Sequence, residues 1–186
     1  RRFPIGKGVP LEVPLPGWVI LEARFRAGHD EALVIARKAQ GRAQLLDVDL
    51  ATGRTTPLPV EDPAALAPAP DGRQVALRTQ AGRLGILDLD RGDLRDLGPL
   101  DTGMELLGWA PEGQALLVVA PGRWPLQVER LPLQGGARTR ERTLGTPGGV
   151  APTRVDRVRL SPDGRALVCS LLRITQSDLL LAQGLE

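Results

Sequence analysis

Four arginines recur at the same place in a repeated pattern of short apolar segments, and one of them stands beside a tryptophan. They are Arg42, Arg83, Arg123 and Arg173, with Trp124 directly after Arg123. Guanidinium groups that converge on one surface bind carboxylates and phosphates through charge-assisted hydrogen bonds. Exposed Trp and Arg are also enriched where proteins bind partners. Two interpretations follow: solvated loop residues, which are the ordinary case, or a site for an anionic ligand or an acidic peptide.

The single histidine and the single cysteine give no support for catalysis. His29 lies in a turn between apolar segments, where an exposed side chain is the ordinary expectation. Cys169 follows Val168 in an apolar segment, which is typical of a buried and inert thiol. The sequence has no Gly-x-Ser-x-Gly elbow, Gly-rich phosphate loop or His-Arg-Asp catalytic loop. It therefore predicts no catalytic residue, no enzyme and no cofactor.

Acidic residues cluster once in a pattern that resembles a calcium loop. Asp88, Asp90 and Asp93 surround Gly92. A calcium loop needs further oxygen ligands and an anchoring glutamate at the right distance, so the match is weak. The segment 47–53 has a similar composition at the same place in the preceding repeat. Aspartates in hairpin turns explain both segments, so we predict turns rather than a metal site.

The elements that position these residues are marked by a recurring turn. It reads Ala69-Pro70-Asp71-Gly72, Ala110-Pro111-Glu112-Gly113 and Ser161-Pro162-Asp163-Gly164, and each copy is flanked by apolar segments. Proline sets φ at the first turn position, the acidic residue caps the turn, and glycine adopts the positive φ. The copies are 41 and 51 residues apart. A hairpin repeated at that period predicts a β-propeller, whose blades are four-stranded antiparallel sheets.

The repeats divide the chain into four units within one domain, residues 1–186. The units span approximately residues 18–59, 60–100, 101–149 and 150–185. The expected strands are 23–26, 32–36, 44–50 and 55–59; 65–68, 74–78, 84–89 and 94–97; 105–109, 115–120, 126–131 and 140–144; and 157–160, 165–171 and 178–182. The fold class is thus all-β, a propeller of four antiparallel blades. The four arginines fall between the second and third strands of their units.

The fourth unit lacks an outer strand, and the N-terminal segment 10–16 offers a spare one. We expect that strand to close the last blade, the alternative being that it belongs to a preceding blade. Pro10 and Pro14 suit an outermost strand, because one row of its N–H groups faces water. The four blades form either a small complete ring or part of a larger one. An incomplete ring has open edges, which favour association into a homo-oligomer.

Composition narrows the class of partner. The chain carries 24 basic and 22 acidic residues, a net charge of +2, which is too balanced for a nucleic-acid-binding surface. It has no apolar run long enough to span a membrane and no signal-peptide pattern at its start. One cysteine excludes an internal disulfide. The first residue is not Met, so we expect a processed form or a part of a larger protein.

The turn 161–165, Ser-Pro-Asp-Gly-Arg, and the apolar strand after it resemble the TolB-like propeller repeat. The segments 158–170 and 177–185 look like the last blade of TolB-like domains that end bacterial serine/threonine protein kinases. The repeat resemblance covers roughly residues 18–185. It implies a propeller, usually of six or more blades, in which the loops between second and third strands share the face of the channel mouth. Cys169 and Leu180 depart from the aromatic residues usual in that family.

These observations predict a non-enzymatic propeller that binds a protein, a peptide or an anionic ligand on its loop face. The resemblance implies the C-terminal part of a larger signalling protein, on either the cytoplasmic or the extracytoplasmic side of a bacterial membrane. One alternative is a truncated or designed propeller fragment that self-assembles. Another is the accessory propeller of a hydrolase, which would control access of substrate through the channel.

Overall fold

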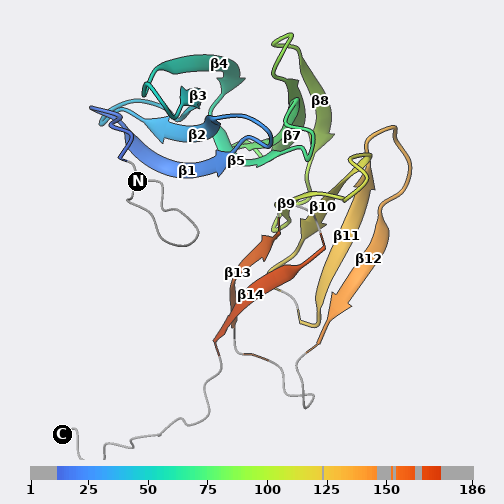
Figure 1. Cartoon of the computed structure of the whole chain (residues 1–186). Coiled ribbons are helices and arrows are strands. Elements are labelled where there is room, and N and C mark those ends of the chain that lie inside the picture. The colour runs from blue at the N-terminus through green and yellow to red at the C-terminus, as the bar shows by residue number, and fades with distance from the viewer. Residues whose placement is uncertain (1–11, 123, 146–151, 153, 162–164, 173–186) are drawn as a thin grey trace, which may run out of the picture.

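The described part of the chain folds into four antiparallel sheets that follow one another along the sequence (Figure 1). The computed structural model describes residues 12–122, 124–145, 152, 154–161 and 165–172. Blade 1 consists of β1 (Val19–Phe25), β2 (Glu31–Arg37), β3 (Gln44–Asp49) and β4 (Thr55–Glu61). Blade 2 consists of β5 (Pro63–Pro68), β6 (Gln74–Thr79), β7 (Arg83–Asp88) and β8 (Leu94–Pro99). Blade 3 consists of β9 (Glu105–Trp109), β10 (Ala115–Val119), β11 (Leu126–Pro132) and β12 (Thr139–Leu144), and blade 4 of β13 (Arg154–Leu160) and β14 (Leu167–Leu172).

The predicted order of strands is confirmed in the first three units and for the two strands of the fourth unit that the structure describes, and each sheet is paired between sequence neighbours. The largest difference at a strand start is in β1, which begins at Val19 rather than at residue 23. A bulge between Ile20 and Glu22 lets β1 continue its pairing with β2 beyond the expected start. The strand expected at 178–182 lies outside the described residues. The part of the chain that the structure describes contains no helix with the length and hydropathy of a membrane span.

The turn chemistry is as predicted. The amide of Gly72 donates a hydrogen bond to the carbonyl oxygen of Ala69 at 3.0 Å, and Gly113 does the same to Ala110 at 2.9 Å. In the turns between third and fourth strands, Asp49 Oδ1 accepts hydrogen bonds from the amides of Ala51 and Thr52, both at 2.9 Å. Asp88 Oδ1 accepts the equivalent pair in blade 2 at 3.0 Å. These aspartates therefore cap hairpins, as the sequence predicted.

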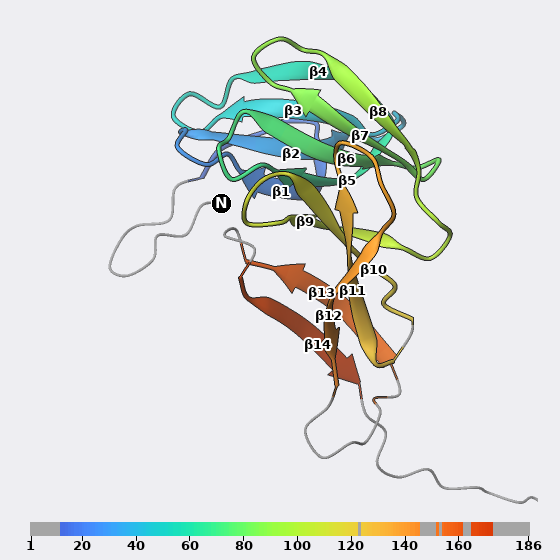
Figure 2. The same cartoon turned by 90° about the vertical axis from the view of Figure 1, so that its right-hand side faces the viewer.

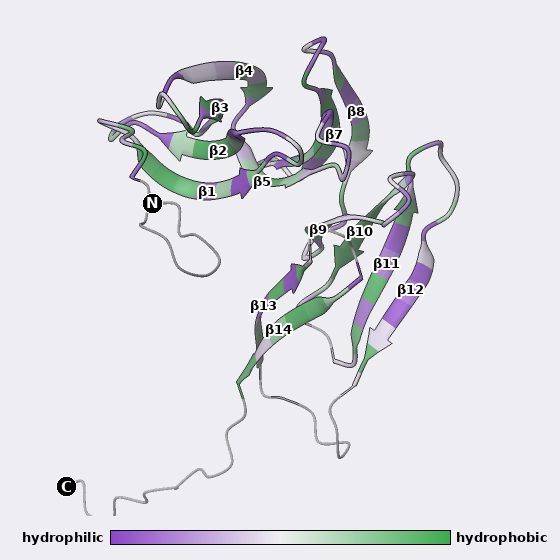
Figure 3. Cartoon of the chain, viewed as in Figure 1, coloured by the Kyte–Doolittle hydropathy of each residue, from purple (hydrophilic) through white to green (hydrophobic). Residues whose placement is uncertain are grey.

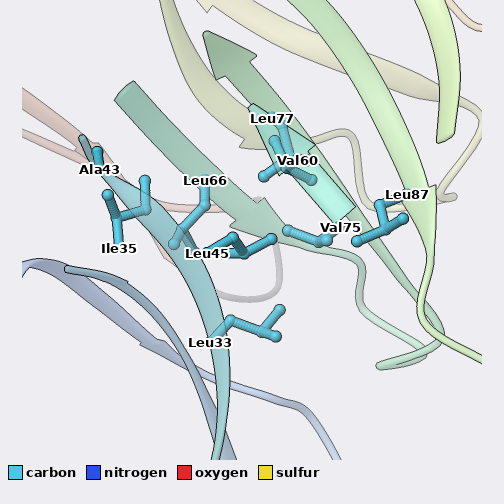
Figure 4. Packing of buried hydrophobic residues seen from close by; sticks show 9 residues of the cluster. All are labelled: Leu33, Ile35, Ala43, Leu45, Val60, Leu66, Val75, Leu77 and Leu87. Atoms are coloured by element: carbon cyan, nitrogen blue, oxygen red, sulfur yellow. The ribbon is translucent and has the colours of Figure 1, made fainter. Parts of the chain in front are cut away.

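The core lies between the blades. Alternate residues of each central strand face opposite neighbours, so Leu33 and Ile35 of β2 pack toward blade 2 while Val34 packs on the other face. Figure 4 shows the junction of blades 1 and 2, where the side chains come from both sheets. Its buried members are Leu33, Ile35, Ala43, Leu45, Val60, Leu66, Val75, Leu77 and Leu87. Similar apolar clusters join blade 2 to blade 3 and blade 3 to blade 4.

The expected N-terminal closing strand is wrong over the residues that the structure describes. Residues 12–15 form no strand there, and Val13, Leu15 and Trp18 pack against the free face of blade 1 rather than against blade 4. Apolar burial explains the difference, because that face presents Val34, Leu46 and other core residues that would otherwise meet water. Val13 and Leu15 stand at alternate positions and form an apolar side, but this pattern does not specify which blade the side covers.

The four first strands lie innermost. Contacts between successive sheets join β1 to β5, β5 to β9 and β9 to β13, and Figures 1 and 2 show these strands converging. The fourth strands β4, β8 and β12 lie at the opposite edges of their sheets. Pro57 and Pro59 lie within β4, while β12 is largely hydrophilic in Figure 3. Such prolines and charges limit edge-to-edge pairing with other chains.

A buried arginine fastens blade 1 to blade 2. Arg26 follows β1 and is 8% exposed, the one buried charged residue among those described. Its Nε donates a hydrogen bond to the carbonyl oxygen of Gly72 at 2.6 Å, and Nη1 donates to Glu31 Oε2 at 2.6 Å. Asp47 and Asp90 lie 3.6 and 3.5 Å from the same guanidinium. The turn of blade 2 is thereby held against the turn of blade 1.

Candidate functional site: a groove between the inner strands

An apolar groove opens where the inner strands of all four blades end, next to the turns that lead into the second strands. Its volume is about 680 Å³. β1 contributes Phe25, β5 contributes Ala67 and Pro68, β9 contributes Trp109, and β13 contributes Leu160. Among the described lining residues, Arg24 carries the single charge and Ser161 the single hydroxyl. The groove therefore offers mainly apolar contact, which suits the side chains of a protein or peptide.

Small residues on the inner strands let the blades approach one another at the groove. Trp109 Nε1 donates a hydrogen bond to the carbonyl oxygen of Ala67 at 2.7 Å and links β9 to β5. Gly108 lies against blade 4, since a Cβ at this position would be 3.1 Å from Leu160 Cδ2. Phe25, by contrast, leaves 63% of its surface exposed at the rim. A fixed wall and an exposed aromatic side chain are features of binding surfaces.

The groove stands directly beside the charged junction of the first two blades. Phe25 and Ala27 line the groove, while Arg26 between them is buried against the carboxylates. Burial raises the pKa of the Asp47 carboxyl above its usual value; the charge of Glu31 adds to this effect and Arg26 opposes it. The electrostatics of the junction thus depend on Arg26, which also fixes the backbone that presents Phe25.

The described members of the predicted arginine site do not share one pocket. Arg42 is exposed between β2 and β3. Arg83 forms an ion pair with Asp96 of the outer strand β8. The hydrogen bonds that Asp96 accepts from Arg83 and from the Gly98 amide lower the pKa of Asp96. Trp124 is half-buried and lines a polar hollow of about 740 Å³, whose described lining includes neither Arg42 nor Arg83. Arg123 and Arg173 lie outside the described residues.

The other reactive residues fall largely where they were expected. The His29 side chain is 41% exposed in its turn, with Nδ1 4.0 Å from Glu31 Oε2. Cys169 is half-buried rather than buried, and packs at the margin of the cluster formed by Val119, Leu126 and Val158. Asp49 and Asp88 belong to the two segments compared with a calcium loop. Each accepts hydrogen bonds from backbone amides of its turn between third and fourth strands. No group of metal-ligating side chains is found within the described residues.

Sequence reasoning missed the groove and Arg26. The repeat contains a signal for Arg26, because the three equivalent positions hold the small residues Ala69, Ala110 and Ser161. The long side chain of an arginine, at a position that holds a small residue in the other repeats, extends beyond its own turn. The groove has no comparable signal. It arises where four strands from separate units meet, and each contributes residues that read as ordinary core.

Known proteins are similar to this chain in fold. No protein-family model and no curated protein sequence matches the chain. Among solved structures, TolB from Acinetobacter baumannii has a TM-score of 0.62 and 17% identity, over 85% of this chain and 39% of that one. A putative TolB from Agrobacterium tumefaciens has a TM-score of 0.57 and 14% identity, over 80% and 53%. The β-propeller domain of the Trilobed protease from Pyrococcus furiosus, with an open velcro topology, has a TM-score of 0.50 and 14% identity, over 67% and 43%.

These likenesses show a TolB-like β-propeller fold, and the chain spans about 40 to 50% of the length of those structures. The four sheets and their order agree with that class. At identities below one-fifth, the comparison carries no function across. The resemblance to propellers at the end of protein kinases is not confirmed by these structures.

Proposed function

We propose that this chain is a non-enzymatic binding module that takes a protein or peptide partner in the groove between its inner strands. The observation that carries the proposal is the lining contributed by all four blades, with Phe25 exposed at its rim. Rigid sheets that present an apolar concavity are well suited to recognition. Apolar contact, rather than proton transfer or nucleophilic attack, is the chemistry that such a lining supports.

We further propose that the module is the propeller part of a larger signalling protein. The resemblance of its last repeat to the propellers of bacterial serine/threonine protein kinases supports this context. In such a protein the groove would recognise a partner and the remaining domains would respond to its binding. The proposal assigns function to a particular site on the fold, because the fold alone does not determine function.

Binding of a short peptide of alternating Leu and Gln, labelled with fluorescein, tests the groove by fluorescence anisotropy. Phe25→Ala should weaken binding about tenfold, because burying an aromatic side chain contributes about 1.5–3 kcal/mol and about 1.4 kcal/mol is tenfold in affinity. Leu94→Ala is the matched control, since Leu94 is also exposed, at 47%, but lies on β8 outside the groove. Equal loss in both variants, or in neither, would contradict the proposal.

A further inference from the structure

A second hollow continues the groove along β1 toward the opposite end of the inner strands. Its volume is about 340 Å³. Pro63 of blade 2 and Arg159 of blade 4 line it together with residues of β1. Ala23 and Arg24 line both this hollow and the apolar groove, so the two spaces meet at β1. The inner strands therefore form one furrow, apolar at the groove end and charged at the other.

One face of β1 gives the furrow its apolar stripe. Leu21, Ala23 and Phe25 are exposed, whereas the intervening Glu22 and Arg24 are half-buried. Leu21 lines the second hollow and Phe25 the groove, with Ala23 between them. Figure 3 shows the hydrophobic colouring of β1 along most of its length. An extended segment lying along β1 would meet apolar contacts at alternate positions, which matches the period of a β-strand.

The charge of the second hollow is positive. Arg24 is paired with Glu22 at 2.5 Å, which leaves the arginine of blade 4 in excess. Arg159 is exposed, and its Nη1 donates a hydrogen bond to the carbonyl oxygen of Val158 at 3.0 Å. Among the described residues, no ion pair joins Arg159 to a carboxylate. An exposed guanidinium beside a paired one, in a concave surface, attracts a carboxylate.

From this arrangement we infer that the partner is an extended segment that is both apolar and acidic. Its apolar side chains lie in the groove against Phe25, and a carboxylate lies in the second hollow between Arg24 and Arg159. The inference rests on the proposed function and adds the charge of the partner. It moves the anion site from the predicted loop arginines to the inner strands.

The probe is a fluorescein-labelled peptide of alternating Leu and Glu. Its affinity for the 186-residue chain is compared with that of the Leu-Gln peptide. The Leu-Glu peptide should bind about tenfold more tightly, and added salt should reduce that difference. Arg159→Gln should abolish the preference, so that the Leu-Glu and Leu-Gln peptides bind with equal affinity. Arg159→Lys should retain part of the preference, because the charge remains and the fork of donors is lost. Arg95→Gln, an exposed arginine on β8, should change neither peptide.

The outcomes separate this inference from the proposed function. If both peptides bind equally and Arg159→Gln has no effect, the carboxylate site is wrong while the groove stands. If neither peptide responds to Phe25→Ala, the groove itself is wrong. If free glutamate displaces the Leu-Glu peptide at the same carboxylate concentration, the hollow takes small anions and the extended partner is wrong. Urea unfolding of each variant checks that it is folded.

Discussion

Arg26 and Gly72 are joined across the boundary between two blades by a hydrogen bond of 2.6 Å from Nε to the carbonyl oxygen. The two residues occupy the first turns of successive repeats and are 46 positions apart in sequence. The bond fixes the distance between those turns, and Phe25 and Ala27 on one side and Pro70 on the other line the groove. The shape of the site therefore depends on a contact that is not itself part of its lining.

Replacing Arg26 by Met should destabilise the chain. The change removes the donor for Gly72 and leaves Glu31 and Asp47 together without their counter-charge. Because Glu31 and Asp47 are partly exposed, we expect a loss of about 2 kcal/mol in the free energy of unfolding, below the value for a fully buried pair. Urea unfolding at pH 7 measures it. A loss no larger than that of Arg95→Met, an exposed control, would show that the contacts of Arg26 contribute nothing to stability.

Gly72→Ala and Gly113→Ala form a matched pair. Both glycines occupy the same turn position, with φ of +70° and +71°, so each substitution incurs about 1 kcal/mol of conformational strain. A Cβ on Gly72 would also lie 2.3 Å from the carbonyl oxygen of Ala27, while Gly113 has nothing within 4 Å. We expect Gly72→Ala to lower the free energy of unfolding by at least about 2 kcal/mol more than Gly113→Ala does, because the added Cβ overpacks the turn. Equal costs would mean that the turns adapt freely.

Asp47→Asn tests the acidity of the junction. The raised pKa of Asp47 means that the folded state binds its proton more tightly than the unfolded state does. The contribution of Asp47 to stability is therefore complete below its unfolded pKa and is lost as pH rises through the folded value. The stability of the native chain minus that of Asp47→Asn should increase as pH falls from 7 toward 4, measured by urea unfolding. A decrease over that range would reverse the assigned direction.

Much of the fold was predictable because turn residues mark the ends of the strands in each repeat. The Pro70, Pro111 and Pro162 turns and the apolar segments around them placed the strands of blades 2 and 3 within two residues. Local turn chemistry also predicted the caps at Asp49 and Asp88. The path of residues 12–15 was not predictable, because an apolar alternation does not specify which of several exposed blade faces it covers.

The candidate site was less predictable than the strands. Its walls come from β1, β5, β9 and β13, so no single segment shows a motif. The loop arginines were periodic in sequence, yet Arg83 is engaged with Asp96 on its own blade. Periodicity identifies equivalent positions in a repeat but does not make their side chains converge.

Arg83→Gln should accordingly leave peptide binding within about twofold of the native value, since a solvent-exposed ion pair contributes little. Trp124→Ala should be similarly neutral, because Trp124 lines a different hollow from Phe25. Anisotropy with the Leu-Glu peptide measures both. Tenfold weaker binding in either variant, with Phe25→Ala unaffected, would return the site to the loop face predicted from sequence.

Hydrogen exchange with and without saturating Leu-Glu peptide reports where on the chain the partner lies. Binding in the groove should slow exchange in segments 21–27 and 105–109 of the inner strands and leave loops 38–43 and 80–83 unchanged. Slower exchange confined to those loops, or no change in the inner strands when the peptide is bound, would contradict binding in the groove.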